Sequence, residues 1–445
     1  MNETIAEIIN SQYPNLETRF ASVFADTSLS FKVVIMQLSW STNETEVRRG
    51  LHRLHCLLQL WEGSLTDPKL SLLANISDAQ KQALVALVLI DSCKGSKESS
   101  AAFTARDHEP AKDSVLFLFD TLSKAPDIYP IFAAISSEAQ RYISDNIMYM
   151  HQRHLLFGEV PLTSLQTWTA KLAQEAQSLK KPFELQRLFW MANLLGFEPI
   201  VTTVGQTAEM HGPTASSQRI DALWDLQVSL EQCLRSQNTT PLVRYYEQAL
   251  PARLQELMVG ATPELVIFVA RLHKLLADKY PDSDALEVLL ANNQPLLSDT
   301  CEAEARCYRE LNLLAVTFMP AVLWALIKIN DSQRDDVKQP LTQVLAMFVK
   351  FQRQLFNELL KPTAREALQG HPCVPLFTVQ RDEAFLRQFY DDPDSVLSLT
   401  VSVGLFISIK AECLKLEATH SSELSVRTSV QSEISGSEMM IGRSP

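Results

Sequence analysis

Residues 47–61 read VRRGLHRLHCLLQLW, and the fold class depends on whether this stretch is a helix or a metal or phosphate site. Asn43 precedes it and Glu46 follows three residues later, a spacing typical of a helix N-terminus. At about 100° per residue one face of the stretch is apolar, and it carries Val47, Leu51, Leu54, Leu58 and Trp61. The pattern therefore predicts an amphipathic helix.

The two histidines of this stretch, His52 and His55, lie on a polar flank beside the apolar face. Two histidines three residues apart on a helix are able to bind one metal ion together. Here Arg48 and Arg49 place fixed positive charge next to them, which disfavours a cation. We therefore interpret the flank as solvent-facing, with Cys56 on the side opposite the apolar stripe, and keep His52 and His55 only as weak metal candidates.

His151 and His154 repeat the same spacing. On that predicted helix Ile143 and Ile147 share a face with His154, which favours a partly buried core histidine. A four-histidine metal site would require this pair to meet His52 and His55, and no feature of the sequence brings the pairs together. The sequence thus predicts no metal and no cofactor.

Other short patterns that carry chemistry do not fit their sites. A cysteine-phosphatase loop needs an arginine six residues after its cysteine, whereas Glu62 stands six after Cys56. Cys301 and Cys307 would lie about 240° apart on a helix, too far round to share one ion. The chain also lacks G-x-x-x-x-G-K-[ST], G-x-G-x-x-G, G-x-S-x-G and H-E-x-x-H. These observations favour a non-catalytic protein, although catalytic residues scattered over several helices would leave no local signal.

Composition favours helices and argues against nucleic acid as a partner. Only 12 of the 445 residues are glycine, which supplies the tight turns of hairpins and phosphate-binding loops. The formal net charge is −12, opposite in sign to a surface that binds nucleic acid. The seven cysteines are widely spaced and odd in number, and the start MNETIAEIIN does not resemble a signal peptide. We therefore expect reduced thiols and a cytoplasmic location.

Helix starts recur along the chain, as at Ser77 with Gln80 and at Thr262 with Pro263, so we predict an all-α fold. A multi-helix array and an irregular bundle are both compatible, and a solenoid-like arrangement stays open because no repeat period is found. From the N-terminus, the sequence predicts a helical region 1–93, a polar loop or linker 94–112, a main helical region 113–417 with a possible break near 205–218, and a disordered serine-rich tail 418–445.

Two apolar segments leave alternatives open. Residues 397–409 alternate apolar and polar side chains as a half-buried strand does, with 374–379 as the available partner, yet small residues spaced four apart also suit a packed helix. We favour the helix. Residues 311–327 are uncharged over a length too short to span a membrane, and we expect a buried core helix.

Taken together, these features favour a non-catalytic protein–protein interaction, scaffold or adaptor protein with a protein partner. One alternative rests on the tail, where Glu423, Glu433 and Glu438 stand among serines before MMIGRSP. The tail resembles the flexible C-terminal signals of bacterial type IV secreted effectors, which would imply an enzyme or enzyme modulator delivered into a host cell. A further alternative is peripheral membrane association through 311–327 or 395–409.

Overall fold

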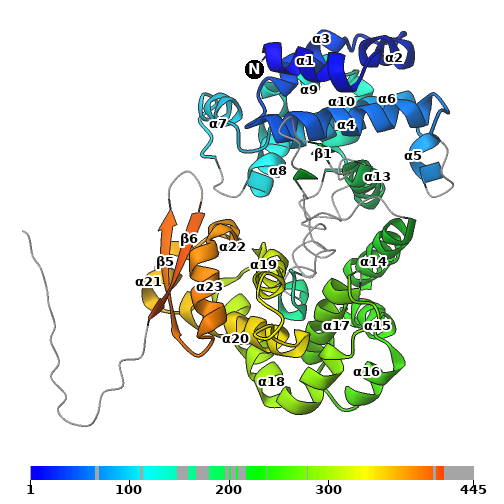
Figure 1. Ribbon diagram of the computed structural model, residues 1–445. Helices are drawn as coiled ribbons and strands as arrows, with labels where there is room; N and C mark the ends of the chain where they lie inside the picture. The colour runs from blue at the N-terminus through cyan, green and yellow to red at the C-terminus, as the bar shows by residue number, and fades with distance from the viewer. Residues whose placement is uncertain are drawn as a thin grey trace, which may run out of the picture.

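The computed structural model describes residues 2–65, 70–110, 114–147, 159–166, 180–195, 200–201, 207–208, 217–236, 238–277, 279–403 and 407–414. Helices dominate this part of the chain, which confirms the predicted all-α class. Buried apolar side chains form two clusters, which we call the N-terminal core and the C-terminal core. Figure 1 shows the helices in two corresponding groups, blue to cyan with green α13 above, and green to orange below.

The N-terminal core is built by short helices around α6 (Asp78–Asp91). Nearly every side chain of α6 is buried, as expected for a helix that is apolar on all sides. Ser77 caps it with a reciprocal bond from Gln80, as the sequence predicted. The other helices of this group are α1 (Asn2–Gln12), α2 (Leu16–Val23), α3 (Phe31–Leu38), α4 (Glu44–Trp61), α5 (Ser71–Ala74), α7 (Lys97–Thr104), α8 (Ser114–Lys124), η2 (Pro126–Ile128), α9 (Pro130–Ala134), α10 (Ser137–Ser144) and α13 (Pro182–Leu194).

The C-terminal core is centred on two long helices that pack along each other, α18 (Ala285–Leu311) and α20 (Leu341–Leu359). α18 is kinked at Asn293, two residues before Pro295, because proline removes a backbone donor and crowds the preceding turn. The remaining helices of this group are α14 (Ser217–Ser236), α15 (Thr240–Gln248), α16 (Ala252–Leu257), α17 (Pro263–Ala277), α19 (Met319–Asp331), α21 (Pro362–Leu368), α22 (Phe377–Arg381) and α23 (Glu383–Asp391).

The strands of the described residues form three two-stranded sheets. β1 (Ile200–Val201) pairs with β2 (Thr207–Ala208), and β3 (Ala315–Thr317) runs parallel to β4 (Cys373–Pro375). β5 (Val396–Val403) and β6 (Ile407–Leu414) form an antiparallel hairpin that packs on α20 to α23.

The chain passes between the two cores more than once. Val160, Leu162 and Leu165 belong to the C-terminal core, although they lie between segments of the N-terminal one. Leu185 and Leu188 of α13 then return to the N-terminal core. The predicted main region 113–417 therefore contributes to both cores.

Three expectations need correction or refinement. Residues 397–409 are strands and not the helix we favoured: β5 pairs with β6, while the expected partner segment 374–379 contributes to β4. The polar segment 94–112 contains helix α7, which buries Phe103. Residues 311–327 are buried for the most part, but they comprise the end of α18, β3 and the start of α19 and not a single helix. The predicted tail 418–445 and most of 205–218 fall outside the described residues.

Candidate functional site

The stretch 47–61 forms α4, and Asn43 accepts the backbone N–H of Glu46 as predicted. His52 and His55 are half-buried and not solvent-facing, because Tyr13 at the end of α1 covers them. The Tyr13 hydroxyl lies 3.4 Å from His52 Nδ1, and its ring centroid lies 5.2 Å from that of His55. Burial lowers the pKa of His55 below its ordinary value of 6.5, and the nearby charges of Arg19 and His52 lower it further. His55 is therefore a neutral imidazole near pH 7.

The thiol of Cys56 is buried and lies 3.6 Å from His52 Nε2, one helical turn away. A thiol beside an imidazole is one half of a nucleophilic dyad, which would also need access for a substrate. Cys56 is only 9% exposed, so a hydrogen bond that orders the α4 flank accounts for the contact. The other two low-ranked metal candidates, His151 and His154, lie outside the described residues.

Arginines of α4 are buried in ion pairs. Arg53 Nη1 donates to Asp91 Oδ2 at 2.8 Å, and Lys94 Nζ reaches Asp91 Oδ1 at 2.6 Å. Arg48 pairs with Glu44 at the helix start, 2.8 Å from its Nε. Asp91 of α6 matches the charge of Arg53 and Glu44, one turn earlier on α4, matches that of Arg48. These pairs serve to hold the fold together. Among the described residues no group of three or more His, Cys, Asp or Glu side chains is placed to hold a metal ion.

The remaining sequence candidates are the two cysteines of α18. Cys301 and Cys307 are both buried free thiols, and burial raises the pKa of Cys301 to about 12. Both thiols therefore stay protonated and unreactive at neutral pH.

The C-terminal core contains a polar network that sequence spacing did not reveal. Arg271 of α17 donates two hydrogen bonds to Glu304 of α18, at 2.8 and 3.0 Å, with both residues almost fully buried. Burial alone would lower the pKa of Arg271, but the Glu304 carboxylate raises it above the ordinary value. The only local signal was a single charged residue inside the apolar run 265–272.

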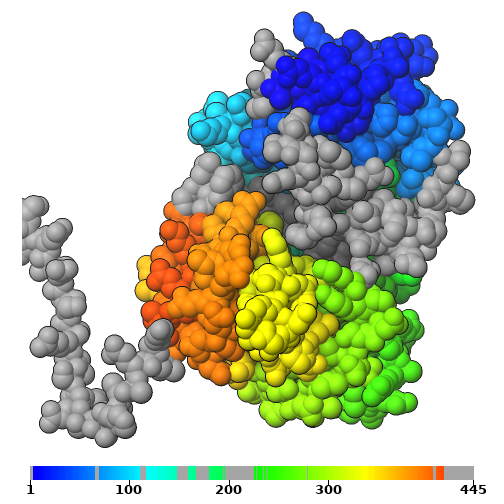
Figure 2. Space-filling model, in the orientation of Figure 1, coloured from blue at the N-terminus to red at the C-terminus, as the bar shows by residue number. Residues whose placement is uncertain are grey.

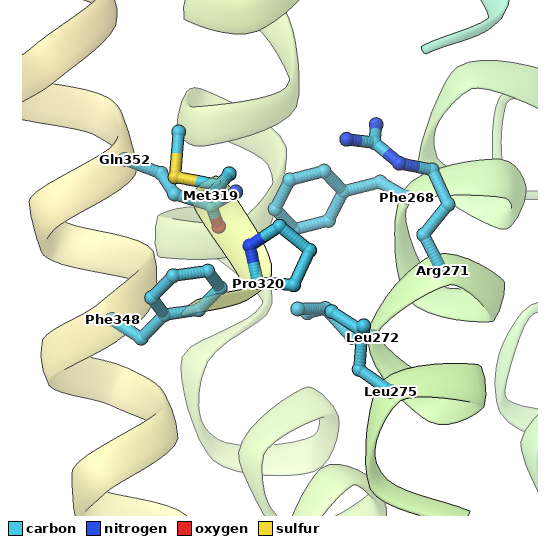
Figure 3. Close-up of a pocket in the computed structure, with 8 residues that line it drawn as sticks. All are labelled: Phe268, Arg271, Leu272, Leu275, Met319, Pro320, Phe348 and Gln352. Atoms are coloured by element: carbon cyan, nitrogen blue, oxygen red, sulfur yellow. The ribbon is translucent and has the colours of Figure 1, made fainter. Parts of the chain in front are cut away.

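A small cavity lies beside this pair (Figure 3). It is lined by Phe268, Arg271, Leu272, Leu275, Met319, Pro320, Phe348 and Gln352. Its volume is about 10 Å³, which is room for one water molecule and not for a substrate. Gln352 Oε1 is buried and lacks a hydrogen-bond partner in the described part of the protein, so a water in this cavity has an acceptor to bind.

Met319 and Pro320, which line the cavity, belong to a sharp turn of the chain from β3 into α19, and we call residues 315–320 the β3–α19 corner. The Tyr308 hydroxyl donates to the carbonyl oxygen of Glu159 at 3.0 Å and accepts the backbone N–H of Val316 at 2.8 Å. The buried carboxylate of Glu159 accepts the backbone N–H of Phe318 at 2.8 Å. A carboxylate at this position also faces the positive end of α19. The corner is thus fixed by hydrogen bonds between residues that lie 149 and 159 positions apart in the chain.

Phe318, at the centre of the corner, breaks two local rules. Its φ is +67°, in the left-handed region, which a bulky side chain rarely adopts. It also occupies the N-cap of α19, where Ser, Asn or Asp would be expected to bond the first turn. The other described non-glycine residues with positive φ are Asn15, Asp107 and Asn312, of the types that tolerate it.

Phe318 is 40% exposed. It makes an edge-on contact with the half-buried ring of Phe377, with centroids 6.4 Å apart. Phe377 begins α22, which packs beside α19 (Figure 1). We call Phe318 and Phe377 the aromatic pair. No sequence signal marked it, because Phe318 falls in the apolar run 311–327.

No family model, curated protein or solved structure matches this chain. None of the described helices is both long and apolar enough to cross a membrane.

Proposed function

We propose that this chain is a non-catalytic interaction protein that binds a protein partner through the aromatic pair. The observation that carries the proposal is the exposed ring of Phe318, held in a strained backbone conformation by a buried carboxylate. Strained residues persist only where the surrounding structure imposes them, and they gather at functional sites.

The energies favour a functional reason for Phe318. A left-handed conformation costs a non-glycine residue about 1–2 kcal/mol. A hydrogen bond to a charged group contributes about 1.5–3 kcal/mol, so the Glu159 carboxylate is able to maintain the strain. Asparagine or glycine at this position would avoid the strain at the same corner. Folding alone therefore does not explain why this position carries a phenylalanine side chain.

An exposed aromatic ring with a fixed orientation suits protein binding. Aromatic residues are enriched among the few side chains that carry most of the energy of protein interfaces. Because Phe377 and the β3–α19 corner hold the ring in place, little side-chain freedom is lost when a partner covers it. The partner chemistry that fits is an apolar pocket or groove that admits one phenyl ring.

The test is quantitative recovery of the partner from native cells. We expect the native chain to co-purify with a protein at a fixed stoichiometry, and Phe377→Ala and Phe318→Asn to lose it. Val259→Asn is the matched control, because Val259 is 84% exposed, lies between α16 and α17 and has no positive φ. Retention of the same partner by Phe318→Asn, or its loss from Val259→Asn, would contradict the proposal.

A further inference from the structure

The β5–β6 hairpin has two outer edges, and the hydrogen bonds made by its backbone show how they differ. β5 and β6 pair over eight residues without a bulge, from Val396 opposite Leu414 to Val403 opposite Ile407. In an antiparallel pair, residues alternate between bonding the facing strand and pointing their N–H and C=O groups outward.

Three contacts identify the outward-pointing residues. Leu397 N–H donates to Gln354 Oε1 of α20 at 2.7 Å. The carbonyl of Cys413 accepts Gln388 Nε2 of α23 at 3.2 Å, and the carbonyl of Ile409 accepts the Thr378 hydroxyl of α22. All three residues have odd numbers. The odd-numbered residues of both strands therefore turn their backbone groups away from the ladder.

The outer edge of β6 bonds neighbouring helices, whereas most of the outer edge of β5 is open to hydrogen bonding within the described residues, with α21 packed against the same strand. Side chains of α22 and α23 bond the β6 edge. On β5, only Leu397 has such a partner within the described residues, and the outward groups of Leu399, Val401 and Val403 have none. In Figure 2 this orange-to-red hairpin forms part of the surface at the left margin.

The open edge also lacks the usual protection against strand pairing. Edge strands are commonly blocked by charged residues, prolines or bulges. β5 reads VLSLTVSV, with no charge and no proline, and its register is unbroken. Thr400 and Ser402 on its exposed face are small and neutral. This edge therefore carries no charge, proline or bulge that would oppose another uncharged strand.

We propose that β5 pairs antiparallel with β5 of a second copy of this chain, so that two hairpins form one four-stranded sheet. The edge is complementary to itself about a two-fold axis, as dimers of identical chains require. Because Gln354 already occupies the Leu397 N–H, the axis passes through Val401. Leu399 then pairs with Val403 of the second copy, and Thr400 lies opposite Ser402.

A second copy fits this edge better than a charged peptide does. The edge carries no charge with which to select a charged segment, and Thr–Ser pairs across strands stabilise each other through their hydroxyl groups. Val403, 37% exposed in the single chain, becomes covered by Leu399. One added strand pair is a small interface, so the dimer is weak. Each chain has a net charge of −12, so salt screens the repulsion between the two copies and strengthens the dimer.

The experiment measures molar mass against concentration by sedimentation, from about 1 µM to about 500 µM, the range in which a weak interface dissociates. The native chain is expected to rise from 50.0 kDa towards twice that mass. The double variant Thr400→Lys/Ser402→Lys places like charges opposite each other in the dimer and stays monomeric, and so does Thr400→Glu/Ser402→Glu. An equal mixture of the two restores the dimer, because lysine then faces glutamate.

The control is Ser408→Lys, on the same face of the hairpin but on β6, the strand away from the proposed interface, and it keeps the native association. Restoration by mixing also shows that both double variants are folded. A native chain that remains at 50.0 kDa at every concentration overturns the proposal. So does a lysine double variant that still dimerises, or a mixture that stays monomeric.

Discussion

At the scale of single residues, the buried pair of Arg271 and Glu304 stabilises the C-terminal core only while both partners are present. Glu304→Gln leaves the Arg271 charge buried without a counter-charge, and we expect this to lower the free energy of unfolding by about 3–5 kcal/mol. The exposed pair of Arg106 and Asp127 is the comparison: Asp127→Asn should lower it by less than about 1 kcal/mol. Denaturant unfolding of the three proteins measures both effects.

The double replacement Arg271→Met/Glu304→Leu separates charge from packing. Apolar side chains of similar volume remove both charges together, so the double variant should be close to native in stability. A double variant as unstable as Glu304→Gln would show that the loss came from packing and not from the unmatched arginine.

His55 gives a prediction about pH. Its pKa is lowered in the folded chain, first by burial and then by Arg19 and His52. The unfolded chain binds a proton at the ordinary pKa of 6.5, whereas the folded chain binds it only at a lower pH. The stability that is present above pH 6.5 is therefore lost as the pH falls from 6.5 through the pKa of His55 in the folded chain. The stability difference between the native chain and His55→Gln should therefore decrease from pH 7.5 to pH 5, when followed by unfolding at each pH.

Arg19→Gln refines that measurement. It removes one cause of the lowered pKa of His55, so the pH-dependent part of the difference should become smaller. If the native chain and His55→Gln respond identically to pH, the imidazole is not buried as the structure has it.

At the scale of elements, Gly50 shows how closely α4 packs on its neighbours. An added Cβ would lie 2.7 Å from Ser92 Oγ and 2.9 Å from Leu38 Cδ2. Glycine to alanine normally stabilises a helix by about 1 kcal/mol. Here we expect Gly50→Ala to destabilise the N-terminal core by about 1–3 kcal/mol through overpacking, measured as a lower midpoint in thermal unfolding.

The control is Gly50→Ala/Ser92→Ala, which removes the nearest atom and should recover part of the loss. An unchanged or raised midpoint for Gly50→Ala would mean that helix propensity outweighs the close approach.

The helices were predictable from the sequence where local signals agree. Asn43 and Ser77 cap the helices that they were expected to start, and the apolar face predicted for 47–61 is buried apart from half-buried Trp61. The hairpin was missed because 397–409 carries both an alternating and a four-residue pattern, and its true partner begins only at 407. Which of two patterns prevails depends on tertiary packing.

The polar networks and the aromatic pair were not predictable. Arg271 and Glu304 are 33 residues apart, and Glu159 and Phe318 are 159 apart. No local spacing specifies such contacts, because they exist only once the helices pack. The strain at Phe318 is likewise a property of the folded backbone, which the letters of an apolar run do not reveal.

At the scale of the whole molecule, the interleaved cores predict how the chain can be divided. A fragment 1–195 includes α13, whereas 1–147 lacks Leu185 and Leu188 and leaves their contacts exposed. We expect 1–195 to unfold cooperatively and at a higher temperature than 1–147. Likewise 157–445 should be more stable than 217–445, which lacks the Glu159 and Ser164 contacts to Phe318 and Leu314.

Circular dichroism during heating measures these four fragments. Equal unfolding temperatures within either pair would show that the crossing segments add nothing to the core that they enter.

The most direct measurement of the proposed function combines two readouts on Phe318→Asn. Asparagine tolerates the left-handed conformation, so the variant should unfold about 2 °C higher than the native chain, as expected for relief of about 1 kcal/mol. The same variant should recover none of the partner that the native chain and Val259→Asn recover. A variant that unfolds at a lower temperature and still binds the partner would contradict the account.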